Sequence, residues 1–524
     1  MKELATQRIT SIPASPGFKV NHSVSFVVSS PVKNVLLGLA CPCILPPKYV
    51  GHGALAPFLP RSCATPSRVA AVGLVRWVPP EKTPMPFQGP SSRWFRLAVL
   101  VCFANPVPVM AEQPKHAELF NLVINAGMIA NYHPQPWPSV PFSGIRLWDS
   151  RTAWLNLNPA QSEYDWSSLD AWLALAGAGN NSVLYTFGGV PQWASSNPHD
   201  RICNFGPGAC DPPKDLNADG SGPDQLWKDF VTALVDHNAY GSGAHIRYWE
   251  MWNEPHNVSD WKGTYAQLVR MVGDAYAIIK AADPDSVILS VTVGWQSKSS
   301  MQWFSGYVNA GGGQYIDKIS CHGYSKENRG YGPPEDMVRY LAPYRAGLQA
   351  LGLGNKEIWD TEANWGRGLL SNSNLQAAWL ARFYLLHISE GIPRQYWFMW
   401  NSGGTGLWLQ DAADHSLPGK LRKAGIAFHE LNKWVVGATM SQHCSNRRSI
   451  WTCTFTRNGG YQALAVWDTA DTCAQNQCQT TNYHFQGNYL NYLTLDGAEF
   501  NITGDTVPIG AQPILLQNKA NISR

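Results

Sequence analysis

The segment YWEMWNEP (residues 248–255) carries the clearest structural signal in the sequence. Its apolar bulk leads into a polar turn that contains Glu254, and the proline that follows ends the extended run. A second segment, IWDTEANW (residues 358–365), repeats this arrangement around Glu362. Barrel enzymes place their reacting groups at the carboxyl ends of the strands. We therefore predict that both segments are barrel strands whose glutamates meet at one opening.

Apolar runs of strand length alternate with amphipathic runs around these two segments. The predicted strands are residues 120–125, 145–148, 183–187, 246–252, 287–293, 316–322, 357–361 and 395–400. The predicted helices are residues 169–176, 226–236, 265–282, 336–351, 375–389 and 419–436. This alternation predicts an α/β fold, a (β/α)8 TIM barrel over residues 112–436. A doubly wound sheet fits less well, because no glycine-rich phosphate-binding turn follows the first strand.

Helical spacing ends near residue 436, and short strands with turn residues follow. The expected strands are residues 451–455, 461–467, 483–485, 489–495 and 513–516, so we predict a small antiparallel β-sandwich over residues 437–524. Trp451, Tyr461 and Trp467 give this part aromatic side chains that could bind carbohydrate. We favour the alternative that they pack the sandwich against the barrel.

The N-terminal region has a different character. Residues 1–84 are rich in Pro, Ser and Val without strand or helix periodicity, so we expect no folded domain there. Arg93 and Arg96 precede the apolar run 97–104, and small residues precede position 112, which predicts a signal peptide over residues 85–111. A start assigned too far upstream, with Met85 as the true start, explains the position of this leader. A genuine cytosolic extension is the alternative.

Cysteine spacing agrees with export to a secreted or periplasmic location. Three close pairs are expected to form disulfides in an oxidising compartment: Cys203/Cys210, Cys444/Cys453 and Cys473/Cys478. Cys321 lies in an apolar strand and is predicted to be a buried thiol. No transmembrane span is expected, because no other segment has the ~18 apolar residues that a spanning helix needs.

Neither a metal nor a cofactor is predicted. None of the cysteine pairs has zinc-site spacing. The loop 215–220 (DLNADG) resembles the first half of a calcium loop, but position 12 would be Leu226 instead of glutamate. We interpret this loop as a solvated polar turn, and whether it binds calcium stays open.

Composition narrows the class of ligand. Of 524 residues, 44% are hydrophobic and 15% charged, with a net charge of +3, so a nucleic-acid partner is not expected. Aromatic residues reach 12% and include 23 tryptophans, which suits stacking on the C–H faces of sugar rings as well as core packing. The composition is thus compatible with a carbohydrate substrate but equally with a large aromatic core, and the oligomeric state is left open.

Glycosidic bond cleavage needs two carboxyl groups in opposite protonation states. A gap of ~5–5.5 Å between them permits a covalent, retaining route, and a wider gap gives inversion. Burial beside Trp252 and a second carboxylate nearby should favour the proton on Glu254.

Two further motifs, taken with the turn around Glu254, make the assignment specific. GIRLWD (144–149), TFGGVPQWAS (186–195) and WNEP (252–255) together resemble clan A glycoside hydrolases, most closely glycoside hydrolase family 39 and its relatives. The resemblance covers residues 117–436, and a trailing sandwich is typical of that group. It implies a retaining O-glycosyl hydrolase with Glu254 as acid/base and Glu362 as nucleophile.

The same resemblance suggests supporting roles for other residues at strand ends. Asn253 would contact the sugar 2-hydroxyl, and Tyr324 would donate to the nucleophile. Substrate-binding roles are expected for these further residues: Arg146, His322, Trp400, Trp148 and Trp193. Turn capping, an interior ion pair, satisfied buried polar groups and core packing are the structural alternatives. Glu250 lies two residues before the turn and is expected to support the site from behind.

Three functions fit these residues. The leading one is a retaining glycosidase or endo-glycanase acting on polysaccharide or oligosaccharide. A noncatalytic carbohydrate-binding barrel and a transglycosylase on the same site are the alternatives. The sugar, the linkage and the choice between exo and endo action depend on loops and stay open.

Overall fold

The structure of the protein is a computed structural model that describes residues 115–129, 135–325, 332–366, 370–409, 419–474 and 477–519. These residues belong to one unit, Asn105–Arg524. The predicted upstream extension and signal peptide, residues 1–84 and 85–111, lie outside the described residues.

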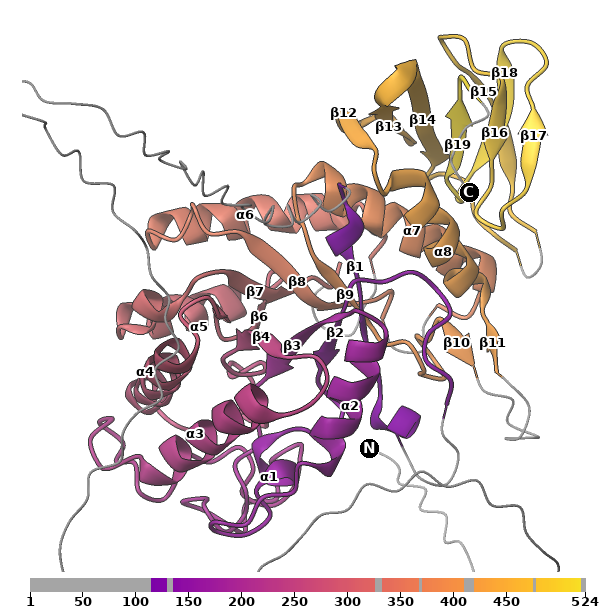
Figure 1. The fold of residues 1–524 in the computed structure, drawn as a ribbon. Coiled ribbons are helices and arrows are strands. Elements are labelled where there is room, and N and C mark those ends of the chain that lie inside the picture. The colour runs from indigo at the N-terminus through magenta and orange to yellow at the C-terminus, as the bar shows by residue number, and fades with distance from the viewer. Residues whose placement is uncertain are drawn as a thin grey trace, which may run out of the picture. The chain divides into compact units, whose positions relative to one another are not determined.

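A parallel sheet forms the centre of the molecule (Figure 1). Its order is β5-β4-β3-β2-β1-β9-β8-β7-β6. The strands are β1 (Phe120–Val123), β2 (Gly144–Leu147), β3 (Ser182–Thr186), β4 (Ile246–Glu250), β5 (Val287–Leu289), β6 (Val293–Gly294), β7 (Ile319–His322), β8 (Ile358–Ala363) and β9 (Gln395–Phe398). The sheet closes because β6 pairs with β7, while Leu289 at the end of β5 bridges to Lys318 just before β7. The predicted (β/α)8 barrel is confirmed.

The fifth barrel strand is broken, which the sequence did not predict. Its two halves, β5 and β6, are separated by residues 290–292. Here the backbone N–H of Ser290 donates to Lys318 O at 2.9 Å, but that of Thr292 donates to Trp252 O at 2.9 Å. Within three residues the hydrogen-bond partner of this chain segment changes from Lys318, just before β7, to Trp252, just after β4. The second of these bonds connects the break to the turn that carries Glu254.

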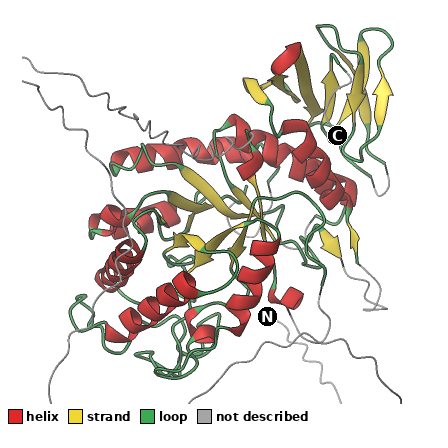
Figure 2. Ribbon diagram, viewed as in Figure 1, coloured by secondary structure: helices red, strands yellow, loops and turns green. Residues whose placement is uncertain are grey.

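Helices cover the outside of the strands (Figure 2). They are α1 (Trp154–Leu157), α2 (Ser167–Ala178), α3 (Gln225–Tyr240), α4 (Tyr265–Ala282), α5 (Lys298–Asn309), α6 (Asp336–Ala350), α7 (Ser373–Ser389) and α8 (Lys423–Val435). The six helices expected from the sequence all appear, and the short α1 and α5 were missed. For α5 the sequence gives a reason. Its first turn is rich in serine, and its interior Gly306 leaves room for Tyr265, whose ring atoms lie within 2.8 Å of the place a Cβ would take.

The C-terminal residues form antiparallel sheets. A six-stranded sheet has the order β12-β13-β14-β19-β16-β17, and β15 pairs with β18. The strands are β12 (Thr439–Arg447), β13 (Ile450–Arg457), β14 (Tyr461–Asp468), β15 (Thr480–His484), β16 (Asn491–Leu493), β17 (Glu499–Asn501), β18 (Thr506–Gly510) and β19 (Ile514–Gln517). Apolar residues of β14 and β19 pack against Val507 and Ile509 of β18, so the two sheets share a core. A separate hairpin joins β10 (Trp408–Leu409) to β11 (Lys420–Leu421).

Aromatic side chains connect the C-terminal sheets with the barrel. Trp467 is fully buried, stacks on Trp451 at 5.9 Å and donates from Nε1 to Glu335 Oε1 at 2.8 Å. Tyr461 is also buried, and its hydroxyl donates to Gln517. These aromatic residues pack within the molecule, as the structural interpretation expects.

All three predicted disulfides are present, and Cys321 is a buried free thiol. These sequence predictions are confirmed. Among the residues that the structure describes, no helix combines the length and the apolar character needed to cross a bilayer.

Candidate active site

The carboxyl ends of β4, β7 and β8 bring the two predicted glutamates together. Glu254 follows β4, Glu362 lies near the end of β8, and His322 ends β7 between them. One carboxylate oxygen of each glutamate and one ring nitrogen of His322 all lie within 4.8 Å of one another. This separation lies near the ~5–5.5 Å between the carboxyl groups of retaining glycosidases.

Arg146, on β2, organises the floor of the site. Its side chain is fully buried and donates at 2.8 Å to each of Glu250 Oε2, Glu362 Oε2 and Asn253 Oδ1. Burial alone would lower the pKa of Arg146, but the charges of Glu250 and Glu362 outweigh it and raise that pKa. Arg146 is therefore a fixed cation that orients one carboxylate of the pair and the asparagine beside the other.

Glu250 faces the barrel interior beneath this pair. It is fully buried and accepts hydrogen bonds from Thr186 Oγ1 at 2.6 Å and Ser320 Oγ at 2.5 Å, besides the one from Arg146. Burial opposes its charge, but Arg146 and His322 outweigh burial and lower the pKa of Glu250. Its place behind Arg146 fits the supporting role expected from the sequence.

His322 contacts both carboxylates of the pair. Nδ1 lies 2.6 Å from Glu254 Oε1, and Nε2 lies 3.7 Å from Glu362 Oε2. Burial alone would lower the pKa of His322, but the charges of Glu362 and Glu254 outweigh it and raise that pKa.

The sequence-based expectation for the protonation of Glu254 is wrong. Burial favours its neutral form, but the charge of His322 and the hydrogen bond from His322 outweigh burial and lower the pKa of Glu254 to about 2. The proton of this pair therefore lies on the imidazole in the unliganded site, and the glutamate is ionised.

Further hydrogen bonds fix each carboxylate. The hydroxyl of Tyr324 donates to Glu362 Oε1 at 2.9 Å, and Asn257 Nδ2 donates to Glu254 Oε2 at 2.8 Å. Glu254 itself has a φ of 41°, a left-handed conformation that costs a non-glycine residue energy and directs its side chain out of the turn. Sequence reasoning missed Asn257, although its position three residues after the glutamate places it in the same turn.

The predicted aromatic residues lie in different environments. Trp148 lines a pocket of about 460 Å³ at the ends of β1 and β2, with its ring 5.8 Å from Arg146 Cζ. Trp400 is buried, with 1% of its surface exposed. Trp193 donates to the carbonyl of Asn158 and lies under Lys214.

Among the residues that the structure describes, two groups of side chains have the donor types of a metal site. Glu254, His322 and Glu362 form one, but the buried Arg146 already supplies positive charge to it. The other contains Cys203 and Cys210, whose sulfurs are joined in a disulfide and offer no thiolate.

The loop 215–220 was interpreted as a solvated polar turn. Asp215 Oδ2 accepts from the backbone N–H groups of Gln225 and Leu226 at the start of α3, and Asp219 Oδ1 accepts from the backbone N–H of Ser221. These contacts give the loop a helix-capping role.

Comparison with known proteins adds a sequence relative. No protein-family model matches the chain. A β-xylosidase of Geobacillus stearothermophilus is 27% identical over 248 residues, which make up 43% of this chain and 44% of that enzyme. The chain therefore matches less than half the length of this curated relative.

Solved structures share the fold. A family 39 glycoside hydrolase from Bacteroides cellulosilyticus WH2 aligns with a TM-score of 0.54 and 17% identity, covering 77% of this chain and 81% of that one. A monomeric β-xylosidase from Caulobacter crescentus CB15 aligns with a TM-score of 0.53 and 15% identity, covering 78% and 97%. A family 39 enzyme from Xanthomonas axonopodis pv. citri gives 0.52 and 16%, covering 78% and 95%. The protein is thus similar in sequence to a β-xylosidase and in fold to the glycoside hydrolases of family 39.

Proposed function

We propose that the protein is a retaining glycoside hydrolase in which Glu362 is the nucleophile and Glu254 the acid/base. The observation that carries this proposal is the approach of the two carboxylates to within 4.8 Å at one barrel opening. Arg146 and Tyr324 each bind one oxygen of Glu362, which suits an anion held ready for attack.

The first step forms a bond between a Glu362 oxygen and the anomeric carbon while the bond to the leaving oxygen breaks. His322 Nδ1, 2.6 Å away, passes its proton to Glu254 as Glu254 protonates the leaving oxygen, so Glu254 ends this step ionised. In the second step Glu254 accepts a proton from water as the water oxygen attacks the anomeric carbon, and it returns that proton to His322 Nδ1. Glu362 then leaves as a carboxylate, and the sugar keeps its configuration.

β-Xylosides are the first substrates to test, because the sequence relative and one of the structural relatives are β-xylosidases. We also propose that the protein acts outside the cytosol. The three disulfides within the described residues support this, since such bonds persist in oxidising compartments.

The test replaces each glutamate and measures turnover of 4-nitrophenyl β-xyloside. Glu254→Ala and Glu362→Ala should each lose about 100-fold or more in kcat, because each removes one half of the mechanism. Glu163→Ala, which changes an exposed carboxylate, is the matched control and should keep full activity.

Azide then assigns the roles. It should rescue Glu362→Ala with an inverted glycosyl azide and Glu254→Ala with a retained one. Unchanged hydrolysis in either glutamate variant would end the assignment. Disaccharide synthesis exceeding hydrolysis in the parent would identify a transglycosylase, and sugar binding without turnover would identify a binding barrel.

A further inference from the structure

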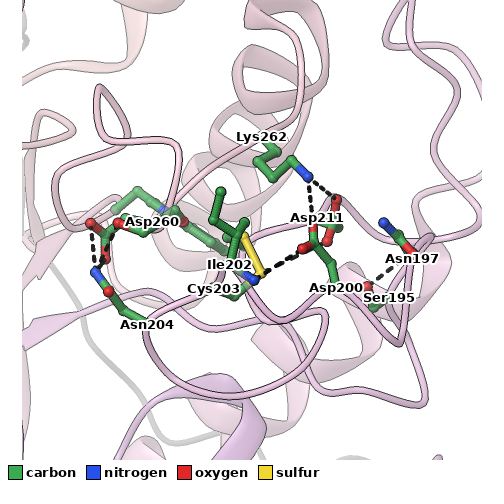
Figure 3. Close-up of a disulfide and its surroundings, with 12 residues drawn as sticks. Ser195, Asn197, Asp200, Ile202, Cys203, Asn204, Asp211, Asp260 and Lys262 are labelled. Atoms are coloured by element: carbon green, nitrogen blue, oxygen red, sulfur yellow. Dashed lines mark hydrogen bonds and ion pairs between the residues drawn. A yellow bond between two sulfur atoms is a disulfide. The ribbon is translucent and has the colours of Figure 1, made fainter. Parts of the chain in front are cut away.

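The disulfide loop, Cys203–Cys210, is bound to the chain segment that follows β4. Asn204 Nδ2 donates to both carboxylate oxygens of Asp260, at 3.2 and 3.3 Å, and its backbone N–H donates to Ser259 O at 3.0 Å (Figure 3). At the other end of the loop, the backbone N–H of Lys262 donates to Cys210 O at 2.7 Å. The loop therefore holds residues 259–262 at two points, and the disulfide joins those two points.

Asp260 is a buried carboxylate on the side of this segment that faces the candidate active site. Only 7% of its surface is exposed. Burial and the charge of Glu254 raise the pKa of Asp260 to about 6, although the hydrogen bonds from Asn204 and Asn257 oppose that rise. Asp260 therefore lies within electrostatic reach of Glu254, and Asn257 forms hydrogen bonds with both carboxylates.

Asn257 is bound to Glu254 through its backbone and through its side chain. Its backbone N–H donates to Glu254 O at 2.9 Å, and its Nδ2 donates to Glu254 Oε2 at 2.8 Å. The carbonyl of Asn257 in turn accepts from the backbone N–H groups of Asp260 at 2.9 Å and Trp261 at 3.0 Å. The left-handed φ of 41° at Glu254 persists only if neighbouring contacts enforce it, and this run of turns supplies such contacts.

The carboxylate of Asp260 also determines which end of the Asn257 amide faces Glu254. The NH2 group can donate to two carboxylates at once, whereas a rotated amide would direct its oxygen toward two negative charges. His322 contacts Glu254 Oε1, so the amide of Asn257 meets the other oxygen, Oε2. One lone pair of Oε2 is thereby occupied, and the other is left for the leaving oxygen of the sugar.

We propose that Asp260 and Asn204 are positioning residues for the acid/base: they hold Asn257 so that its Nδ2 donates to Glu254 Oε2. This inference rests on the proposed function and deepens it, because it assigns to the disulfide loop a part in proton transfer to the leaving group. The disulfide fixes Asn204 opposite Asp260. Attack by Glu362 does not depend on these contacts.

The test varies how far the reaction needs a proton from Glu254. The phenolate released from phenyl β-xyloside leaves poorly unless it is protonated, whereas the anion released from 2,4-dinitrophenyl β-xyloside leaves unaided. Asn204→Ala changes an exposed side chain and removes both hydrogen bonds to Asp260. It should lower kcat/KM for the phenyl substrate about tenfold and that for the dinitrophenyl substrate less than about twofold.

Two substitutions of Asp260 separate its hydrogen-bonding role from packing. Asp260→Ala should show the same selective loss on the phenyl substrate. Asp260→Asn keeps an oxygen that can accept from Asn257, and its NH2 group can donate to a rotated amide of Asn204, so most of the lost activity should return. If Asp260→Asn were no better than Asp260→Ala, the role given to this oxygen would be wrong.

Ile202→Ala is the matched control, because Ile202 is 54% exposed and lies beside the same disulfide but has no hydrogen-bonding group in its side chain. It should hydrolyse both substrates as the parent does. An equal loss on both substrates in Asn204→Ala, or no loss on the phenyl substrate, would overturn the positioning role alone. No turnover of either aryl xyloside by the parent protein would overturn the proposed function, and this inference with it.

Discussion

His322 determines where the proton of the site lies. It contacts Glu254 at 2.6 Å, and its Nε2 lies 3.3 Å from Arg146 Nη2 and 3.7 Å from Glu362; the two carboxylates outweigh burial and the arginine and raise the pKa of His322. A carboxyl group whose pKa is about 2 is ionised near neutral pH, so Glu254 by itself holds no proton for the leaving oxygen. The histidine resolves this difficulty, because it keeps a proton within one hydrogen bond of the glutamate.

The pH profile follows from this arrangement. The raised pKa of His322 should set the basic limb of kcat/KM, because the proton of the pair is lost when the histidine deprotonates. In His322→Gln the proton must reside on Glu254 itself, so the basic limb should move to lower pH. Rates on 4-nitrophenyl β-xyloside across pH measure this shift.

Tyr324→Phe is the control for the pH profile, because Tyr324 contacts Glu362 instead of Glu254 and its loss should leave the basic limb in place. A basic limb that stays unchanged in His322→Gln would contradict the role given to the histidine.

The candidate site residues were predicted from their place at strand ends and from the resemblance to family 39, and the structure brings Glu254, His322 and Glu362 together. The sequence could not give the sign of the pKa shift at Glu254, because that sign depends on a contact with a residue from another strand. The contact of Asn257 with Glu254 was not predicted, because asparagine is common in turns for structural reasons alone.

At the scale of elements, Gly323 determines how β7 and β8 meet at the site. Its N–H donates to Asp360 Oδ1 at 2.9 Å, and a Cβ on this glycine would lie 2.2 Å from Asp360 Oδ2. Asp360 cannot move away easily, because its Oδ2 also lies 2.9 Å from His387 Nε2.

Gly323→Ala should therefore destabilise the fold by about 1–3 kcal/mol through overpacking, and it should lower activity by displacing the adjacent His322 and Tyr324. Denaturant unfolding and kcat/KM measure the two effects. Gly403→Ala is the control, since nothing lies within 4 Å of the place its Cβ would take. A Gly323 variant as stable and as active as this control would refute the packing argument.

Hydrophobic patterns in the sequence correctly predicted the strands that are buried on both faces. Barrel strands such as β1 and β9 are buried on both faces and read as apolar runs. The break between β5 and β6 depends on a switch of hydrogen-bond partner, which side-chain pattern does not record. Most of β12 is exposed and polar, so no apolar alternation marked it as a strand.

At the scale of the whole molecule, Glu335 joins the barrel to the C-terminal sheets. It accepts from Arg382 Nε on α7 at 2.7 Å and from Trp467 Nε1 on β14 at 2.8 Å. Arg382 is buried, so loss of its partner leaves an unpaired charge inside the protein.

Glu335→Ala should cost about 3–5 kcal/mol in the free energy of unfolding. Because the barrel and the sheets share this contact, denaturant unfolding followed by fluorescence and by activity should show one coincident transition. Arg339→Ala, which breaks a largely exposed pair with Asp336, should cost less than about 1 kcal/mol. Separate transitions in the parent protein, or equal costs for the two variants, would contradict this account.

The covalent intermediate tests the central claim most directly. Treatment with 2-deoxy-2-fluoro-β-xylosyl fluoride, followed by proteolysis and mass spectrometry, locates the sugar that remains attached to the protein. We predict a single fluoroxylosyl ester on Glu362, formed as activity is lost. An adduct on another carboxylate, or steady turnover of β-xylosides with no adduct on Glu362, would contradict the retaining mechanism proposed for this pair.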